Sequence, residues 1–276
     1  MSANPVVKIY VATHKQFEMP TQSTIYCPVL GGASLYPDLD FGYQKDNVGE
    51  NISEKKEWYN ELSVLYWAWK NSDADIKGLC HYRRFFYTSD TSIAGKYILD
   101  RQSIIDSLRE YDIILPVPYI HKGISVYDAY SRSGKGLQAD LDLAREIVGE
   151  MYPAYMPAFD TVMKRDWASL CNALVARKDV FDQYADWLFS VLFELEGRIS
   201  FEHRDAQQIR VMGFLGERLL NIWVEHHRLR VKYYRLHRTD VPKNLSYYIH
   251  IAAEKAGLYK LFHMGRYYIE KQAEQQ

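Results

Sequence analysis

Short apolar runs alternate with stretches of helical spacing along most of this chain. The runs with the length of buried strands are 6–12, 75–80, 112–115, 171–176 and 229–236. The stretches with apolar residues every three or four positions are 53–71, 137–152, 180–197 and a segment that opens at 213. This alternation predicts a single α/β domain, in which helices cover a mostly parallel sheet.

One long segment interrupts the alternation. From Pro20 to Gly49 the chain is irregular and rich in Gly, Asp, Pro and Tyr, which indicates a long loop at the ligand-binding edge and a candidate lid. Asn51 and Ser53 follow it and are expected to cap a helix that runs to about Asn71.

Polar residues stand directly after two of the expected strands. Thr13, His14 and Lys15 follow the first strand, and a run of His81, Tyr82 and the two arginines 83 and 84 follows the second. Ligands of open α/β sheets bind at the carboxyl ends of the strands. Two guanidinium groups beside an imidazole and a phenol suit a diphosphate, although a pair of surface arginines bound to carboxylates is an equally ordinary interpretation of the residues alone.

Glu217 is the carboxylate that we favour as a general base. It follows Gly213 and Gly216 near an expected helix start, where the positive end of the helix would stabilise its charge. A helix-start glutamate without chemistry is the commoner case. The alternative carboxylates are Asp160, Glu202 and Asp205.

Composition excludes several classes of function. The 34 basic and 35 acidic residues leave a net charge of −1, so no general field favours nucleic acid. The three cysteines are far apart, so neither a disulfide framework nor a zinc site is indicated, and a reducing compartment fits best. Neither an export signal nor a run of about 18 apolar residues is visible. We therefore expect a cytoplasmic protein.

A divalent metal is not favoured. Mn²⁺ and Mg²⁺ prefer paired carboxylates, and no Asp-x-Asp follows Cys80. Two such pairs, 38/40 and 73/75, stand in the irregular segment and before a strand. We expect cations of the protein to stabilise the leaving group, with no required cofactor.

The last part of the chain carries an excess of positive charge. Five basic residues between Arg228 and Arg238 predict a positive edge on the last strand. Beyond a catalytic domain at 1–242, residues 243–276 are expected to form an amphipathic helical tail. This tail either packs on the domain or lies at the inner face of the cytoplasmic membrane.

Several segments between about Lys8 and Asp240 together resemble one bacterial family, catalogued as a domain of unknown function. Its members are regarded as glycosyltransferases of capsule, exopolysaccharide or lipopolysaccharide. The segments that carry the resemblance are 8–15, 51–55, 61–71, 78–85, 140–143, 186–189 and 213–220, and the His-Tyr-Arg-Arg run is the most specific.

The resemblance implies a GT-A-like, Rossmann-related fold and transfer of sugar from a nucleotide sugar. The donor would be a UDP-sugar, such as a galactose form, and the acceptor a lipid-linked or nascent surface polysaccharide. It adds Asn51, Ser53, Glu61 and Asn172 to the donor-binding residues 13–15, 81 and 82. Glu217 would be the base, and Arg83 and Arg84 would stabilise the leaving group. Inversion and retention both remain open, as do a binding module without turnover and a phosphotransferase.

Overall fold

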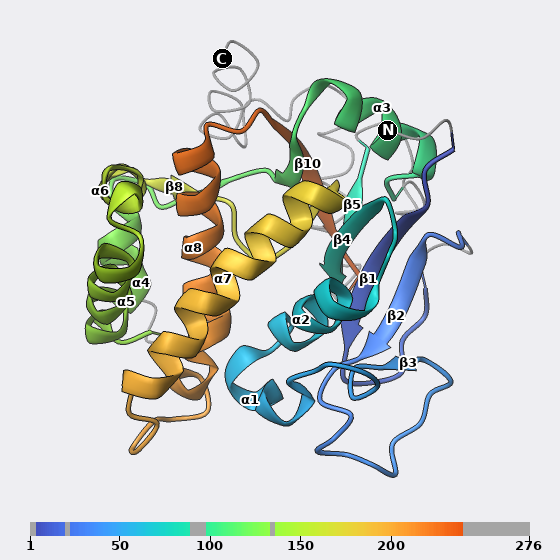
Figure 1. Cartoon of the computed structure of the whole chain (residues 1–276), viewed down its shortest axis with the longest axis horizontal. Coiled ribbons are helices and arrows are strands. Elements are labelled where there is room, and N and C mark those ends of the chain that lie inside the picture. Colours follow the sequence, from blue (N-terminus) through green and yellow to red (C-terminus); the bar gives the residue numbers. More distant parts are fainter. Residues whose placement is uncertain (1–3, 20–22, 89–97, 133–135, 240–276) are drawn as a thin grey trace, which may run out of the picture.

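The computed structural model describes residues 4–19, 23–88, 98–132 and 136–239 (Figure 1). The strands are β1 (Val7–Thr13), β2 (Tyr26–Leu30), β3 (Gln44–Lys45), β4 (Ile76–His81), β5 (Arg84–Tyr87), β6 (Ile113–Pro116), β7 (Tyr119–Ile120), β8 (Trp167–Ala168), β9 (Leu174–Arg177) and β10 (Val231–Arg238). The α-helices are α1 (Lys56–Tyr59), α2 (Leu62–Asn71), α3 (Arg101–Glu110), α4 (Val126–Arg132), α5 (Gln138–Met151), α6 (Met156–Lys164), α7 (Lys178–Arg198) and α8 (Val211–His227).

The main sheet is mixed. Strands β3, β2, β1 and β4 are parallel neighbours, as are β6 and β10, whereas β5 and β9 run antiparallel to their partners. The pairing of β9 with β4 closes a small barrel of β4, β5, β10, β6 and β9. The alternation of strands and helices is confirmed, but the sheet is parallel only in part, because the sequence pattern does not reveal which strands reverse direction.

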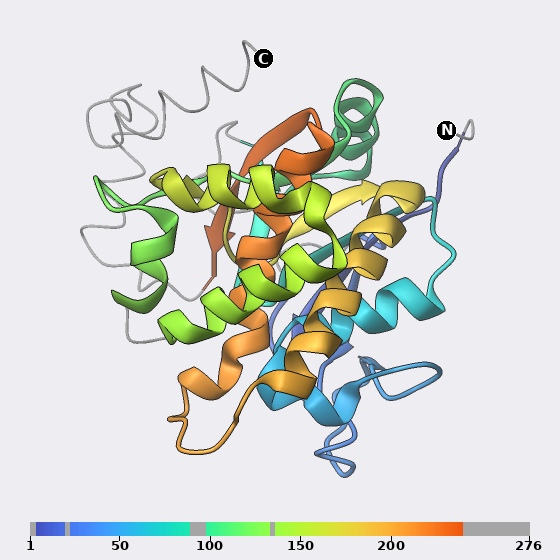
Figure 2. The ribbon, with the colours of Figure 1, turned by 60° about the vertical axis from the view of Figure 1, so that its left-hand side comes forward.

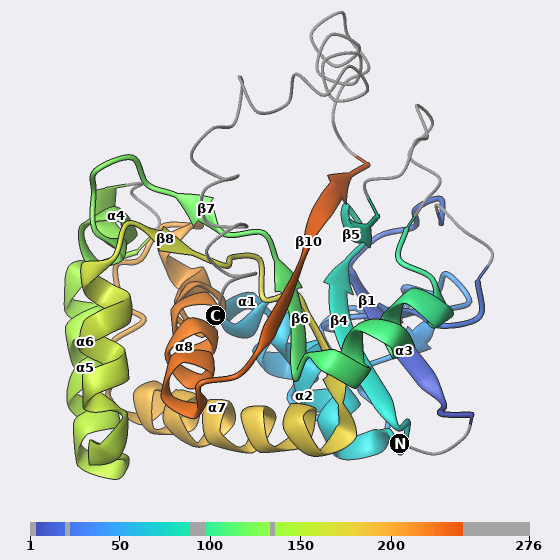
Figure 3. The ribbon, with the colours of Figure 1, turned by 90° about the horizontal axis from the view of Figure 1, so that it is seen from above.

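The two faces of the sheet are covered by different helices. In β1, Tyr10 and Ala12 belong to the core under α2 and α7, whereas Ile9 and Val11 belong to a second core under α3. Successive strand residues point to opposite faces, so an apolar run such as this one is buried on both sides. Figure 3 shows α7 below the strands and α3 in front of β4 and β1.

Helix α8 packs against both α6 and α7, and α5 also packs directly against α7 (Figures 1 and 2). The first turns of α8 also pack on the junction of α1 and α2, where two glycines permit close approach. A Cβ at Gly213 would lie 2.8 Å from Asn60 Nδ2, and one at Gly216 would lie 2.8 Å from Leu62 Cδ1. The Gly-Phe-Leu-Gly run therefore sets the position of α8 against the sheet.

The segment from 20 to 49 is not a single loop. It contributes β2 and β3, and in the described part buried Asp46 holds the turn after β2, accepting the backbone N–H groups of Gly32 and Ala33 at 2.9 and 3.0 Å. Ser53 does not cap a helix, because its hydroxyl is buried and donates to Asp46. A 3₁₀ turn, α1 and α2 replace the single helix expected here, and Asn60 separates them at a positive φ of 52°.

Other boundaries also differ from expectation. Helix α7 passes through Gly197 and ends at Arg198. Strand β10 pairs with β5 and β6 on its two sides, and Arg230 beside its start is ion-paired with Asp112 at 3.3 Å. Six further elements were not expected from the sequence, namely strands β5, β7 and β8 and helices α3, α4 and α6.

Within the described ranges, no helix is long and apolar enough to cross a bilayer. The expected tail, 243–276, lies outside the described residues.

Candidate functional site

A cleft opens at the carboxyl ends of β1 and β4. It consists of two adjoining cavities of about 620 and 160 Å³, which share Asn60, Glu61, His81, Arg83 and Arg210. The smaller cavity adds residues 12–14 and Lys56. The larger one extends away from β1 along residues Arg84, Tyr119, His121, Ala129, Tyr130, Gly136, Leu170, Cys171, Gln207, Gly213, Phe214, Glu217 and Arg218.

Parallel pairing brings the two polar strand ends together. Ala12 is in register with His81, so the residues after each strand emerge at the same edge of the sheet. Thr13 is buried, and its hydroxyl donates to the Lys15 carbonyl at 2.6 Å, which fixes the turn after β1. The tight β4–β5 connection then places Arg83 and Arg84 on the cleft wall.

The end of the cleft nearest β1 is cationic. Lys56, Arg83, Arg84 and Arg210 line it, and Glu61 is the acidic residue among them. Burial, with help from Arg84 and Arg83, lowers the pKa of His81 to about 3, so this imidazole is neutral at pH 7. Burial and then Lys56 also lower the pKa of His14. Fixed cations, and not histidines, therefore make this end attractive to an anion.

Helix α1 and Asn60, which directly follows it, supply residues that the sequence did not single out. Lys56 and Asn60 are four residues apart and reach the same wall of the cleft. Burial lowers the pKa of Lys56, and the neighbouring Glu61 opposes this shift. Arg210 Nε donates to Asn60 Oδ1 at 2.8 Å, which joins α1 to the segment before α8.

Glu217 lies in the second turn of α8 and not at its start, since the helix begins at Val211. The helix dipole argument for this residue is therefore wrong. Its carboxylate accepts the Cys171 backbone N–H at 2.8 Å and pairs with Arg218 Nη1 at 2.6 Å. Burial raises the pKa of Glu217, while Arg218 and Arg84 oppose the shift. The net result is a carboxyl group that is more basic than an exposed glutamate.

A strained turn connects the two glutamates of the cleft. Cys171 and Asn172 have φ values of 82° and 47°, a region that residues with a side chain rarely adopt. Asn172 Nδ2 donates to Glu61 Oε1 and to the Gly213 carbonyl, each at 2.8 Å. Asn60 also has a positive φ. Backbone strain of this kind collects at functional sites, because the surrounding structure must hold it in place.

The cleft brings together most of the residues expected in the site. Those that line it are Thr13, His14, Glu61, His81, Arg83, Arg84 and Glu217. Others lie behind its wall: Asn172 holds Glu61, and buried Tyr82 packs edge-on against His14 at 5.3 Å. Lys15 is exposed, with its ammonium 5.3 Å from the Tyr82 ring. Asn51 and Ser53 shape the preceding loop, with Asn51 Oδ1 accepting the Ser53 N–H at 3.1 Å.

The rival carboxylates lie outside the lining of the cleft. Asp160 pairs with Arg145 between α5 and α6 at 3.0 Å. Glu202 is exposed, and Asp205 accepts the backbone N–H groups of Gln207 and Gln208. These positions favour Glu217 among the four candidates.

Six residues that line the cleft were not expected from the sequence: Lys56, Asn60, Arg210, His121, Tyr130 and Arg218. Two signals could have indicated some of them. Lys56 and Asn60 are four residues apart in the helix expected from Ser53 to Asn71, so they would share one face of that helix. Arg210 lies about one helical turn before Gly213, where a further helix was expected to begin. His121 and Tyr130 gave no signal, because strand β7 and helix α4 that present them were not expected.

Neither Asp-x-Asp pair lies in the cleft lining. Asp38, Asp40 and Asp73 are exposed, and Asp75 accepts the Val6 backbone N–H at 2.7 Å. Among the residues that the structure describes, no group of three or more His, Cys, Asp or Glu side chains could hold a metal ion.

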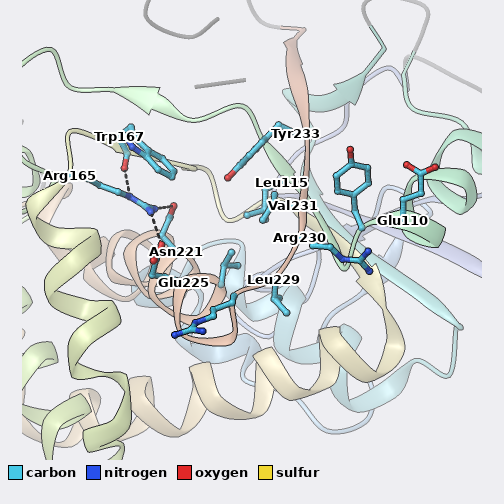
Figure 4. Close-up of a pocket in the computed structure, with 13 residues that line it drawn as sticks. Glu110, Leu115, Arg165, Trp167, Asn221, Glu225, Leu229, Arg230, Val231 and Tyr233 are labelled. Atoms are coloured by element: carbon cyan, nitrogen blue, oxygen red, sulfur yellow. Dashed lines mark hydrogen bonds and ion pairs between the residues drawn. The ribbon is translucent and has the colours of Figure 1, made fainter. Parts of the chain in front are cut away.

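A second cavity of about 550 Å³ lies on the other end of α8 (Figure 4). Two of its three lining arginines are engaged with protein groups: Arg165 bonds Asn221 and Glu225 and stacks on Trp167, and Arg230 pairs with Asp112. Burial lowers the pKa of Arg165 to about 10. None of the site residues predicted from the sequence lines this cavity, so the cleft at the strand ends is the stronger candidate.

The fold and the cleft define an α/β protein with an anion-attracting site at the carboxyl edge of its sheet. Residues 8–228 match the family described as Domain of unknown function (DUF4422), and the chain belongs to this family.

One solved structure similar to this chain is described as "WbbM bifunctional glycosytransferase apo structure", with 32% identity and a TM-score of 0.79. The match covers 86% of this chain and 46% of that one, so this chain spans less than half the length of that protein. A comparison with curated proteins finds no match.

Proposed function

We propose that this protein is a glycosyltransferase that uses a nucleotide-sugar donor. The observation that carries the proposal is the group of Lys56, Arg83, Arg84 and Arg210 around the strand ends, in a cleft that continues to the partly buried Glu217. Charge-assisted hydrogen bonds from such cations stabilise a diphosphate. The likeness to a protein described as a glycosyltransferase supports the same class.

The proposed donor is a UDP-sugar, such as a galactose form, with its diphosphate at the cationic end of the cleft. An acceptor hydroxyl attacks the anomeric carbon, and the bond from that carbon to the diphosphate oxygen breaks. The electron pair of that bond leaves with the diphosphate, whose charge Arg83 and Arg84 stabilise. The hydroxyl proton passes to Glu217, whose raised pKa suits a general base. The acceptor would be a lipid-linked or nascent surface polysaccharide.

Transfer is proposed to proceed without a required metal ion, because the strand end carries His81, Arg83 and Arg84 where paired aspartates would hold a metal. The test is turnover in EDTA, which should retain the activity seen in untreated protein. Loss of activity that Mn²⁺ restores would contradict metal independence and would direct attention to Asp38, Asp40, Asp73 and Asp75.

A panel of nucleoside diphosphates and nucleotide sugars tests the donor. A bound donor should raise the melting temperature by mass action, and slow release of UDP in the absence of an acceptor should accompany it. Tight binding without turnover for any donor and acceptor would instead indicate a binding module. No shift with any of these ligands at millimolar concentration would contradict the proposal.

A further inference from the structure

The end of the large cavity away from β1 differs in chemistry from the cationic end. It is lined by Tyr119 and His121 beside β7, Tyr130 of α4, and Arg218 of α8. Tyr119 is half exposed and packs edge-on against the His121 ring at 5.1 Å. This end therefore combines aromatic surface with hydrogen-bonding groups.

Three buried polar atoms at this end have no hydrogen-bond partner in the described part of the chain. They are His121 Nε2, Tyr130 OH and Arg218 Nε. Tyr130 is 1% exposed and Arg218 is 8% exposed, so neither side chain can turn to bulk solvent. A buried polar group without a partner costs about 1–3 kcal/mol, and such groups occur where a ligand or an ordered water completes the set.

The charges here are already paired. Arg218 bonds Glu217, and behind Tyr130 the buried Arg204 pairs with Asp140 through two hydrogen bonds of 2.7 Å. Burial, and then Arg218, lower the pKa of His121, which keeps its imidazole neutral at pH 7. A charged ligand would therefore meet no unpaired charge of opposite sign among these groups. The hydroxyl groups of a neutral ligand, in contrast, could form hydrogen bonds with the unpaired donors and acceptors.

We infer that this end of the cleft is an acceptor subsite that binds a neutral sugar unit, with Tyr130, His121 and Arg218 Nε bonding its hydroxyls and Tyr119 packing on its ring. The inference rests on the proposed glycosyltransferase function and names the chemical class of its acceptor. The three polar atoms lie just beneath the cleft wall, so binding requires a small side-chain adjustment. Glu217, which lines the same cavity and pairs with Arg218, would then face the acceptor hydroxyl.

The test is saturation-transfer NMR with four methyl glycosides, in the presence of saturating UDP. Methyl galactoside, glucoside and mannoside are the neutral probes, and methyl glucuronide is the anionic one. At least one neutral glycoside should bind saturably, and Tyr130→Phe should weaken it by roughly five- to tenfold, the effect of one hydrogen bond. Tyr119→Ala, at the exposed rim, should weaken it as well.

Tyr184→Phe is the matched control. Its hydroxyl is also buried and unpartnered in the described residues, but it lies in the core against Trp223, 5.4 Å from that ring. This variant should bind the glycosides as the parent does. Because both substitutions delete an unpaired hydroxyl, neither should lower the melting temperature.

The outcomes separate the two proposals. Three results would contradict the neutral subsite and leave the donor site unaffected. UDP binds but no neutral glycoside does, or the glucuronide binds best, or the Tyr130→Phe protein binds the neutral glycoside as tightly as the parent. If neither UDP nor any nucleotide sugar binds, the glycosyltransferase proposal itself fails.

Discussion

Glu217 on α8 accepts a hydrogen bond of 2.8 Å from the backbone N–H of Cys171, in the strained turn before β9. This contact joins a helix to the sheet at the middle of the cleft and fixes one oxygen of the carboxylate. The other oxygen pairs with Arg218. A partly buried carboxylate that is held at two points has the fixed position that a general base requires.

Replacement of Glu217 by Gln should separate chemistry from donor binding. The amide keeps the shape of the side chain but cannot accept a proton, so transfer should fall by roughly two to four orders of magnitude. UDP affinity, measured by calorimetry, should remain near the parental value. Transfer at the parental rate would remove Glu217 from the mechanism and leave Glu61, the other carboxylate of the cleft, as the next to test.

The pH dependence of transfer follows from the raised pKa of Glu217. The base is active when it is deprotonated, so kcat/KM should be constant above this pKa and fall as the pH decreases through it. Because burial raises the pKa, the fall should begin above 4.5, the ordinary value for a glutamate. A rate profile between pH 4 and 8 measures this, and a rate that stays constant down to pH 4.5 would argue against a buried base.

Arg83 and Arg84 should act on the diphosphate. Replacing either with Ala removes a charge-assisted contact worth about 1.5–3 kcal/mol, so UDP should bind roughly ten- to more than one hundredfold more weakly, with slower turnover. The control is Arg145→Ala, which removes an exposed arginine that pairs with Asp160 away from the cleft. Equal effects of the three substitutions on UDP binding would mean that these arginines act only through general charge.

The same substitution at two glycines should have opposite effects on stability. At Gly213 a Cβ would lie 2.8 Å from Asn60 Nδ2, so Ala should lower the free energy of unfolding by up to about 2 kcal/mol and disturb the Asn60–Arg210 contact. At Gly197, inside α7, no atom lies within 4 Å of the new Cβ, so Ala should add up to about 1 kcal/mol. Denaturant unfolding measures both, and an unchanged Gly213→Ala protein would contradict the close packing of α8.

Sequence periodicity predicted the elements that carry long apolar patterns. Strands β1 and β4 and helices α5 and α7 appear where expected, since burial against a sheet or a helix imposes a regular spacing. Strand β2 contains Pro28 in a short run, and β5 begins at the second arginine of the pair, so neither resembles an isolated strand. Which strands run antiparallel depends on long-range pairing that no local pattern records.

Position after a strand predicted one part of the candidate site. Thr13, His14, His81 and the arginines after it are adjacent in sequence to β1 and β4, so the rule for sheet edges locates them. His121, Tyr130 and Arg210 reach the cleft through packing of segments that are distant in sequence, and nothing in their local sequence indicates this. The burial that raises the pKa of Glu217 is likewise a product of the tertiary structure.

The central claim is transfer of a sugar from a nucleotide to an acceptor hydroxyl, and product analysis tests it most directly. The parent protein and Glu217→Gln would each be incubated with a panel of UDP-sugars and neutral methyl glycosides, and the products identified by mass spectrometry. The account predicts a glycoside enlarged by one sugar, formed with an equal amount of UDP by the parent and at least about a hundredfold more slowly by the variant. A phosphorylated glycoside, or donor binding without any enlarged product across donors and acceptors, would contradict it.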